Sequence, residues 1–340
     1  MFLRNAWYAA ARTDEVTRGL SAHTILGDNV ALFREEDGRA VALEDACAHK
    51  KLPLSMGRLK DAGVECGYHG MVFDHEGRCV HIPSQTTIPK KATVRSYPLA
   101  EKWGFVWIWM GDPSVADESS IVHIEDFDNR VWGRTRGGSM TIDTSYLNIT
   151  DNLLDPSHVA FVHLSSFAAD GCEDTPLEVR TEERGVTVYR WIMDREPPAY
   201  YAKLVTFRGN CDRLQHYEVR FPSVAINKSI FAPAGTGAET GSLHPDTYMM
   251  VSYNFLTPIN DHQTRYFWFQ HRNTNPDDEA ISKMVAEGAE QAFAEDRLVL
   301  EGVQRGQDSS DSEGMVLSID HGPIRFRQLL QEKIAREQEA

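Results

Sequence analysis

The sequence predicts an α+β protein with two domains, and three patterns in the 340-residue chain lead to that prediction. Residues 24–110 have the pattern of short strands joined by turns, residues 176–275 return to strand patterns, and residues 276–338 have the periodicity of helices. With 41% apolar residues, the chain is long enough to bury two separate cores. We therefore expect domains at residues 1–112 and 113–340.

The first domain is expected to consist of β-hairpins. Strand-forming runs at residues 30–33 and 40–43 flank an Asp-Gly dipeptide at 37–38, which is typical of a tight hairpin turn. The aromatic and β-branched run at 105–109 predicts a further strand. The Gly-Asp-Pro sequence at 111–113 ends that strand, so we place the domain boundary there.

The second domain is expected to combine one sheet with helices. Its pattern is helical over residues 140–165 and again in two segments around 278–305 and 322–338. Between them lie four runs typical of strands, at residues 186–189, 217–219, 249–253 and 265–269.

Charge and composition exclude several classes of partner. The net charge of −15 argues against nucleic acid and anionic membranes. No run approaches the roughly 20 apolar residues of a membrane-spanning helix, and the first residues lack the features of a signal peptide. The five cysteines are odd in number and irregularly spaced, which does not indicate a disulfide framework. We therefore expect a cytoplasmic protein.

Two short Cys–His pairs predict a metal cluster in the first domain. Cys47 and His49 are separated by one residue, Cys66 and His69 by two, and sixteen residues lie between the pairs. A Rieske [2Fe–2S] cluster needs two Cys on one iron and two His on the other. Zinc sites of the Cys2His2 type instead pair Cys with Cys and His with His. The mixed pairs favour a Rieske cluster, with zinc or a structural coincidence as alternatives.

A second metal site is predicted from His158 and His163. Two such histidines are more often packed than ligating, but the carboxylates and amide just before them could orient imidazole rings. An electron carrier in the first domain also requires an acceptor. Residues five apart lie roughly 140° apart on a regular α-helix. A helix that begins at Asp155-Pro156, or a local π-type widening, would let both rings reach one metal.

The third ligand of this site is expected to be a distant carboxylate. Two imidazoles and one carboxylate form the facial triad of Fe(II) oxygenases, which leaves positions open for O2. We choose Asp296 because Phe293 and Leu300 mark the buried side of its helix. Glu295 and Glu301 are the competing candidates, and a solvated helix face is the alternative for all three.

Together these motifs resemble the Rieske non-haem iron aromatic oxygenases, specifically the oxygenase components of the vanillate O-demethylase, dicamba monooxygenase and toluenesulfonate monooxygenase branch. The resemblance covers nearly the whole chain, from residues 4–10 through both Cys–His pairs and residues 107–112 to the helix around 295–296. It implies an N-terminal Rieske β-domain followed by a catalytic domain in which helices cover a curved antiparallel sheet, a helix-grip-like fold.

The resemblance also implies the role of each site residue. The cluster ligands it implies are Cys47, His49, Cys66 and His69. The ligands it implies for mononuclear Fe(II) are His158, His163 and Asp296, with Asn152 beside the metal. Asp155 matches the family's bridging aspartate, which joins a cluster histidine of one subunit to an iron histidine of the next in a ring-shaped homotrimer.

The function implied is that of an oxygenase component that acts on a small aromatic substrate with O2, by O-demethylation or hydroxylation. No G-x-G-x-x-G motif follows a strand, so electrons from NAD(P)H are expected to arrive through a separate reductase or ferredoxin. The alternative is an iron–sulfur electron-transfer or sensor protein with a ligand-binding domain, which would need no mononuclear iron.

Two positions depart from the family pattern, and two residues are candidate substrate contacts. Lys50 follows His49 where the family has arginine, which keeps the charge but loses the planar guanidinium. Glu287 occupies the position at which the dicamba enzymes present a tryptophan to their substrate. Asn254 and His271 lie on strands that are expected to line the pocket.

Overall fold

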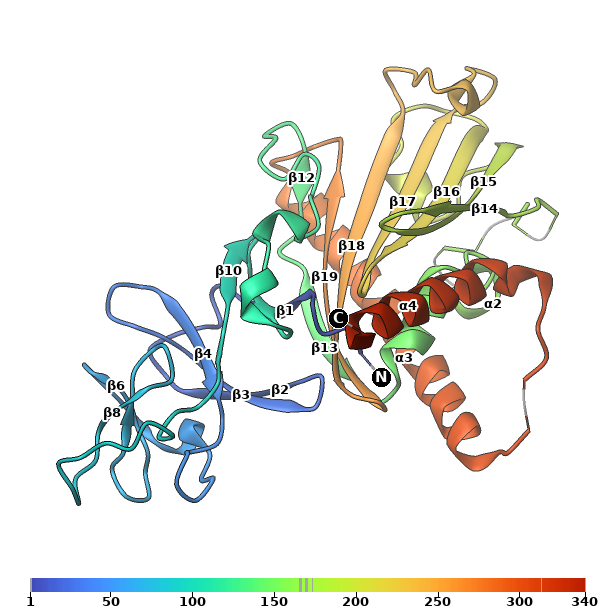
Figure 1. Ribbon diagram of the computed structural model, residues 1–340. Coiled ribbons are helices and arrows are strands. Elements are labelled where there is room, and N and C mark those ends of the chain that lie inside the picture. Colours follow the sequence, from blue (N-terminus) through green and yellow to red (C-terminus); the bar gives the residue numbers. More distant parts are fainter. Residues whose placement is uncertain (1, 165–166, 169–170, 173, 313, 340) are drawn as a thin grey trace. The chain divides into compact units, whose positions relative to one another are not determined.

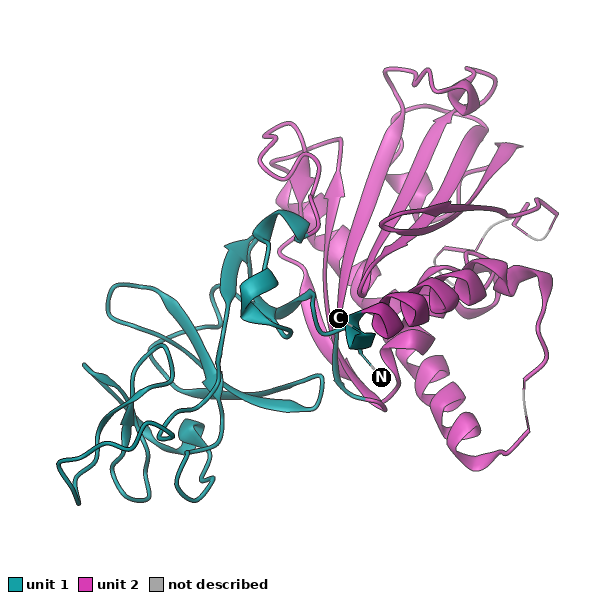
Figure 2. Ribbon diagram, in the orientation of Figure 1, with its two compact units in different colours: residues 1–121, 257–260, 337–340 teal, residues 122–256, 261–336 magenta. Residues whose placement is uncertain are grey.

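The computed structural model describes residues 2–164, 167–168, 171–172, 174–312 and 314–339 (Figure 1). Two compact units make up the chain (Figure 2). Unit 1 contains residues 1–121, 257–260 and 337–340, and unit 2 contains residues 122–256 and 261–336. The predicted α+β class is confirmed. Among the described residues, no helix combines the length and the apolar character needed to cross a membrane.

Unit 1 is built from small antiparallel sheets. One has the order β1-β11-β10, with β1 at Trp7–Arg12, β11 at Phe105–Trp109 and β10 at Leu99–Lys102. The second has the order β2-β3-β4-β9, at Ser21–Ile25, Asp28–Arg34, Ala40–Glu44 and Ser96–Tyr97. The third has the order β5-β6-β7-β8, at Arg58–Lys60, Gly63–Glu65, Val72–Phe73 and Cys79–His81.

The hairpin predicted at the Asp-Gly dipeptide is confirmed. β3 and β4 pair antiparallel around it, with Arg34 opposite Ala40. Gly38 has a φ of 89°, a left-handed conformation that glycine adopts without a Cβ penalty. This register aligns Phe33 and Val41, which both belong to the hydrophobic core that also contains Cys47 and Cys66. The two cysteines are thus anchored in packed structure.

Unit 2 has one eight-stranded antiparallel sheet with the order β12-β19-β18-β17-β16-β15-β14, and β13 also pairs with β19. The strand bounds are β12 Gly133–Arg134, β13 Gly138–Ile142, β14 Glu178–Glu182, β15 Gly185–Arg195, β16 Cys211–Arg220, β17 Val224–Pro233, β18 Tyr248–Asn260 and β19 Gln263–Arg272. The helices are α1 Tyr146–Leu153, α2 Val159–Val162, α3 Glu279–Ser309 and α4 His321–Glu339. Short 3-10 turns lie at Leu54–Met56, Pro113–Val115, Glu118–Ser120, Tyr201–Lys203, Ala238–Thr240 and Ser318–Asp320.

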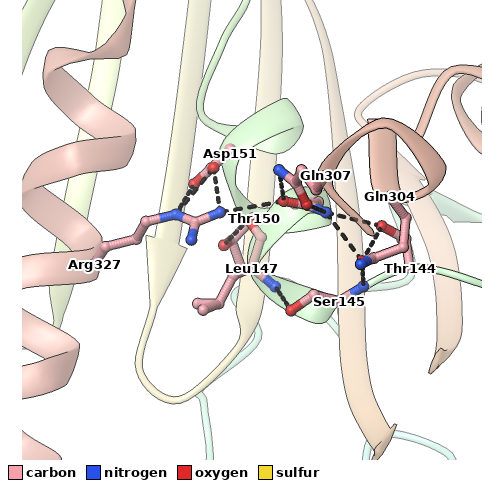
Figure 3. Close-up of polar contacts among 9 residues, drawn as sticks. Thr144, Ser145, Leu147, Thr150, Asp151, Gln304, Gln307 and Arg327 are labelled. Atoms are coloured by element: carbon pink, nitrogen blue, oxygen red, sulfur yellow. Dashed lines mark hydrogen bonds and ion pairs between the residues drawn. The ribbon is translucent and has the colours of Figure 1, made fainter. Parts of the chain in front are cut away.

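Helix α1 is held between the sheet, α3 and α4. The Ser145 side chain caps its first turn by accepting a hydrogen bond from the Leu147 N–H. Arg327 of α4 donates to both carboxylate oxygens of Asp151, with contacts between 2.6 and 3.0 Å (Figure 3). From α3, Gln304 accepts from the Ser145 N–H at 2.8 Å (Figure 3). Because α1 leads directly into residues 155–163, these contacts position the segment that carries both predicted iron histidines.

Candidate functional site

The three predicted iron ligands converge in unit 2. His158, His163 and Asp296 each offer one ligand atom, and these atoms lie within 4.8 Å of one another. Oδ1 of Asp296 is 3.5 Å from Nε2 of His158 and 3.3 Å from Nε2 of His163. His163 and Asp296 are only 4% and 5% exposed. Two imidazoles and one carboxylate at these distances match the donor set that suits Fe(II) with open positions.

A short interrupted helix brings the two histidines together. Helix α1 ends at Leu153, and α2 covers only Val159–Val162, so His158 precedes the helical turn and His163 follows it. His163 leaves the helical conformation, with φ −103° and ψ 44°. The helix therefore begins later than Asp155-Pro156, and no π-type widening is needed. The approach of the two rings depends on the ends of α2, not on one helix face.

The Nδ1 atom of each imidazole, on the side of the ring away from Asp296, hydrogen-bonds to an oxygen that fixes the ring's orientation. Nδ1 of His158 hydrogen-bonds to the backbone oxygen of Asp155. Nδ1 of His163 donates to Oε2 of Glu295 at 2.8 Å. These bonds leave both Nε2 atoms directed toward Asp296, which is how a metal-binding imidazole is usually held. Glu295, a competing candidate for the third ligand, is thus a support for His163.

Burial and the neighbouring carboxylates act in opposite directions on His163. Burial disfavours its charged form, but the hydrogen bonds and charges of Asp296 and Glu295 outweigh that effect, so the pKa of His163 is raised. A divalent cation supplies the positive charge that this carboxylate pair favours. The residues present therefore fit a divalent metal.

Three neighbouring residues take different positions around the group. Asn152 donates from Nδ2 to Oδ1 of Asp296 at 3.3 Å. The carboxylate of Asp155 accepts from the Ser157 N–H at 2.7 Å and lines a second cavity of about 330 Å³ together with Asn152 and His158. Glu301 bonds to Arg297 at 2.7 Å and takes no part in the ligand group.

A cavity of about 120 Å³ opens onto the ligand group. Its walls include all three predicted iron ligands and side chains from β16, β17, β18 and β19. The aromatic residues in the lining are Phe167, Tyr201, Tyr217, Phe231 and Phe293. A largely apolar chamber with a few polar groups beside a metal site is the form expected of a small-molecule pocket.

Asn254 lines this cavity, and His271 does not. Asn254 is fully buried, donates to the Asn227 side chain and accepts from the Tyr266 hydroxyl. On β19, neighbouring side chains point to opposite faces of the sheet, so Gln270 faces the cavity and His271 faces away. His271 packs against Phe127 instead. The prediction named the strand correctly but did not say which of its residues face the cavity, and His271 is not among those that do.

The four residues predicted to hold the cluster also lie together, in unit 1. Nδ1 of His49 is 3.2 Å from Nδ1 of His69, and both rings are exposed. Cys47 and Cys66 are each only 2% exposed. Burial raises the pKa of the Cys47 thiol, so binding a metal there must release a proton. Two buried thiols and two imidazoles in contact offer the two Cys and two His that a Rieske cluster needs.

The two cluster loops are held by matching backbone hydrogen bonds. The N–H of Cys47 donates to the oxygen five residues ahead, and its oxygen accepts from Lys51, four residues ahead. Cys66 makes the same two bonds, with Met71 and Gly70. Lys51 and Gly70 both have positive φ, at 60° and 70°. The loops therefore share one backbone conformation, although His follows Cys by two residues in the first and three in the second.

Comparison with known protein families shows to which family the chain belongs. Residues 6–98 match the Rieske [2Fe-2S] domain, and residues 142–336 match the vanillate O-demethylase oxygenase C-terminal domain. The chain belongs to the vanillate O-demethylase family of Rieske oxygenases. The predicted [2Fe–2S] and mononuclear iron cofactors of the oxygenase are thereby confirmed, and the carrier or sensor alternative is not supported.

Individual relatives agree with this assignment. The oxygenase is 37% identical over 308 residues to a putative toluene-4-sulfonate monooxygenase system iron-sulfur subunit of Comamonas testosteroni, covering 90% of this chain and 89% of the relative. It is 34% identical to a vanillate O-demethylase oxygenase subunit of a Pseudomonas species, covering 100% and 97%. A crystal structure of dicamba monooxygenase bound to 3,6-dichlorosalicylic acid superposes with a TM-score of 0.91 at 29% identity, covering 100% and 99%.

A further crystal structure supports the mononuclear iron. Dicamba monooxygenase with non-heme iron and dicamba superposes on the oxygenase with a TM-score of 0.81 at 27% identity, covering 99% of both chains.

Sequence reasoning missed two kinds of functional residue. It treated Glu295 only as a rival ligand, although its position next to Asp296 allows it to face the back of a histidine ring. It also passed over Arg213 and Gln215 of β16, which line the cavity. Alternation along that strand would have placed both on the same face as Tyr217, which is the signal that could have identified them.

Proposed function

We propose that the oxygenase inserts one oxygen atom of O2 into a small aromatic substrate, by O-demethylation or by hydroxylation. The observation that carries this proposal is the opening of the His158, His163 and Asp296 group into a chamber lined with aromatic side chains. Such a chamber offers an aromatic ring apolar contacts and excludes water from the reacting centre.

We propose that the two groups of neighbouring side chains described above hold the two metal centres. The cluster ligands in this proposal are Cys47, His49, Cys66 and His69. The iron ligands in this proposal are His158, His163 and Asp296. When Fe(II) is bound there, it supplies the open coordination positions at which O2 is reduced beside the substrate. We propose functional domains at residues 1–112 and 113–340.

The surrounding residues hold this arrangement in place. Glu295 and the Asp155 carbonyl orient the two imidazoles, and Asn152 hydrogen-bonds to the carboxylate of Asp296. Asn254 contributes to the cavity wall, and its hydrogen bonds to neighbouring strands keep that wall rigid. The substrate ring would meet this wall.

Electron supply is proposed to involve other chains. A separate NAD(P)H-dependent reductase or a ferredoxin delivers electrons to the cluster. Within a homotrimer, Asp155 joins an iron histidine of its own subunit to a cluster histidine of the next. His158 hydrogen-bonds to the backbone oxygen of Asp155, and the cluster histidine of the next subunit donates to its carboxylate. Its position beside His158, on the wall of the 330 Å³ cavity, supports this assignment. The cytoplasmic location stays a prediction.

The deciding experiment is a substrate screen with a surrogate reductase. Substituted benzoates, sulfonates and methoxyarenes are tested for substrate-dependent NAD(P)H and O2 consumption, and 18O2 is used to label the product. We expect one class to couple both consumptions to product that carries one labelled oxygen. We also expect three irons per chain, whereas a plain cluster protein would have two. Rapid NADH oxidation by the chain alone would contradict the need for a reductase.

A further inference from the structure

An arginine of the C-terminal helix α4 holds the last turn of α1 by a two-point ion pair. Nε of Arg327 donates to both carboxylate oxygens of Asp151 at 3.0 Å, and Nη2 donates to Oδ2 at 2.6 Å (Figure 3). Nη2 also donates at 3.3 Å to Oδ1 of Asn148, three residues earlier in α1. The charged side chains are 34% and 33% exposed, so water screens the pair only in part. A guanidinium that faces a carboxylate in this way fixes its orientation as well as its distance.

The residue that follows Asp151 contacts a predicted iron ligand. Nδ2 of Asn152 donates to Oδ1 of Asp296 at 3.3 Å. That oxygen lies 3.5 Å from Nε2 of His158 and 3.3 Å from Nε2 of His163. Successive side chains on a helix point about 100° apart, so Asp151 reaches α4 while Asn152 reaches Asp296 on α3. A rotation or shift of this turn of α1 would change both contacts together.

Other contacts of α1 with α3 lie nearer its start and join neutral groups. The Ser145 N–H donates to Oε1 of Gln304 at 2.8 Å (Figure 3). Nδ2 of Asn148 donates to Oε1 of Gln304 at 3.3 Å and to Oε1 of Gln307 at 2.9 Å. These amide contacts hold the first part of α1, whereas the ion pair of Arg327 holds the end of it. Loss of the ion pair should therefore leave α1 packed and loosen its last turn.

We propose that Arg327 is a positioning residue for the mononuclear iron site. Through Asp151 it fixes the last turn of α1, and that turn sets the Asn152 amide against the carboxylate of Asp296. This inference rests on the proposed function, because it takes Asp296 as an iron ligand. Arg327 is not among the described residues that line the cavity beside the ligand group, so α1 transmits its effect on the metal.

Metal affinity measures this effect without turnover. Chelator competition on the full chain with its cluster gives the Fe(II) dissociation constant, and the cluster absorbance shows that the cluster keeps its own iron. Arg327→Gln removes the charge and the planar donors, so it should weaken Fe(II) binding about tenfold, the lower end of the range for residues that orient metal ligands. Arg327→Lys should lose less, because lysine keeps the charge.

A matched control lies on the same helix. Arg336 of α4 is 76% exposed and pairs with Glu332 at 3.8 Å. Arg336→Gln changes the net charge by the same amount as Arg327→Gln and should leave Fe(II) affinity unchanged.

A double-mutant cycle separates positioning from a general stabilisation of the fold. If Arg327 acts through Asn152, Arg327→Gln should weaken Fe(II) binding no more than about twofold in a protein that already carries Asn152→Ala. The loss of thermal stability from Arg327→Gln should be the same in both backgrounds, because the ion pair with Asp151 is present in both. If Arg327→Gln does not fold, Asp151→Asn removes the same ion pair at constant side-chain size and is used in its place.

The outcomes separate this proposal from the proposed function. Unchanged Fe(II) affinity in Arg327→Gln would overturn the positioning role, and so would an equal loss of affinity with and without Asn152→Ala. If an aromatic compound stimulates O2 consumption while either of these results is found, the oxygenase function stands and the role of Arg327 is wrong. If Arg327→Gln weakens Fe(II) binding only when Asn152 is present, but no aromatic compound stimulates O2 consumption, the role of Arg327 stands and the proposed function is wrong.

Discussion

The two metal regions of the oxygenase are built in opposite ways. The cluster region uses two short loops, exposed histidines and buried cysteines, and each loop is closed by its own backbone hydrogen bonds. The iron region joins α2 to a residue of α3 far along the chain, and its histidines are oriented by Asp155 and Glu295. An electron carrier needs ligands near the surface, whereas a site for O2 chemistry needs enclosure and fixed rings. The difference in construction therefore corresponds to the difference in task.

The largest expected effects come from removing one ligand in each region. His158→Ala should remove one iron per chain and all substrate-dependent O2 consumption, because two remaining ligands cannot hold Fe(II). The cluster spectrum should be unchanged. His49→Ala should abolish the EPR signal of the reduced cluster and leave the mononuclear iron in place. Iron analysis and EPR on both variants measure this independence, and loss of both metals in either variant would contradict it.

Asp155→Asn tests the proposed connection between the two regions. One carboxylate oxygen of Asp155 accepts from the Ser157 N–H, and the other is free for the proposed hydrogen bond from a cluster histidine. Asparagine has a single acceptor oxygen and cannot serve both. We expect both metals to be retained and single-turnover product formation with a pre-reduced cluster to slow by about 10- to 100-fold.

The alternative role of Asp155 predicts a different outcome. If its carboxylate only accepts from the Ser157 N–H, asparagine replaces it well and the rate stays unchanged. Light scattering should show a multiple of the 38.4 kDa chain, three in the proposed trimer. A monomer with full activity would end the bridging role.

Glu295→Gln tests whether the hydrogen bond from Nδ1 of His163 to Glu295 strengthens metal binding. Glutamine keeps the length but replaces a carboxylate acceptor by an amide, so His163 becomes a weaker ligand. We expect Fe(II) affinity to fall by about 10- to 100-fold, measured by competition with a chelator. Glu301→Gln is the matched control on α3, because Glu301 bonds to Arg297 instead, and it should leave the affinity unchanged.

The smallest effect concerns a buried histidine outside both metal regions. Neither ring nitrogen of His271 has a hydrogen-bond partner among the described residues, and burial lowers its pKa to about 4. In the unfolded chain His271 takes up a proton near pH 6.5, whereas in the folded chain it does so only near pH 4. Between pH 6.5 and pH 4 the unfolded chain therefore binds more protons than the folded chain. The free energy of unfolding should therefore fall as the pH drops through this window, by about 3 kcal/mol from His271.

Replacing this histidine should remove that part of the acid sensitivity. His271→Leu has similar volume and no titratable group. Urea unfolding at pH 7 and pH 4.5 should show a smaller loss of stability than in the unmodified protein. An identical loss in both proteins would mean that the acid sensitivity comes from other groups. His163, which carboxylates surround, has its pKa shifted in the opposite direction.

The contrast between the regions also explains what the sequence could predict. Cys47, His49, Cys66 and His69 are close in the chain, so their spacing alone indicated a cluster. His158 and His163 were found for the same reason, but their helical setting was not, because the helix begins only at Val159. The pocket depended on which strand residues share a face. A shift of one residue on β19 exchanges His271 for Gln270, and no local pattern determines that phase.

The matching loops of unit 1 have a consequence for how the cluster site tolerates change. The same pair of backbone hydrogen bonds closes both loops, so the peptide groups define their curvature and the intervening side chains do not. The left-handed position is filled by Lys51 in one loop and by Gly70 in the other. Lys51→Gly should leave the backbone conformation of both loops unchanged. Gly70→Lys would instead place a Cβ 2.9 Å from the Pro83 ring. Glycine can therefore replace Lys51 in the first loop, whereas lysine cannot replace Gly70 in the second without a shift of Pro83.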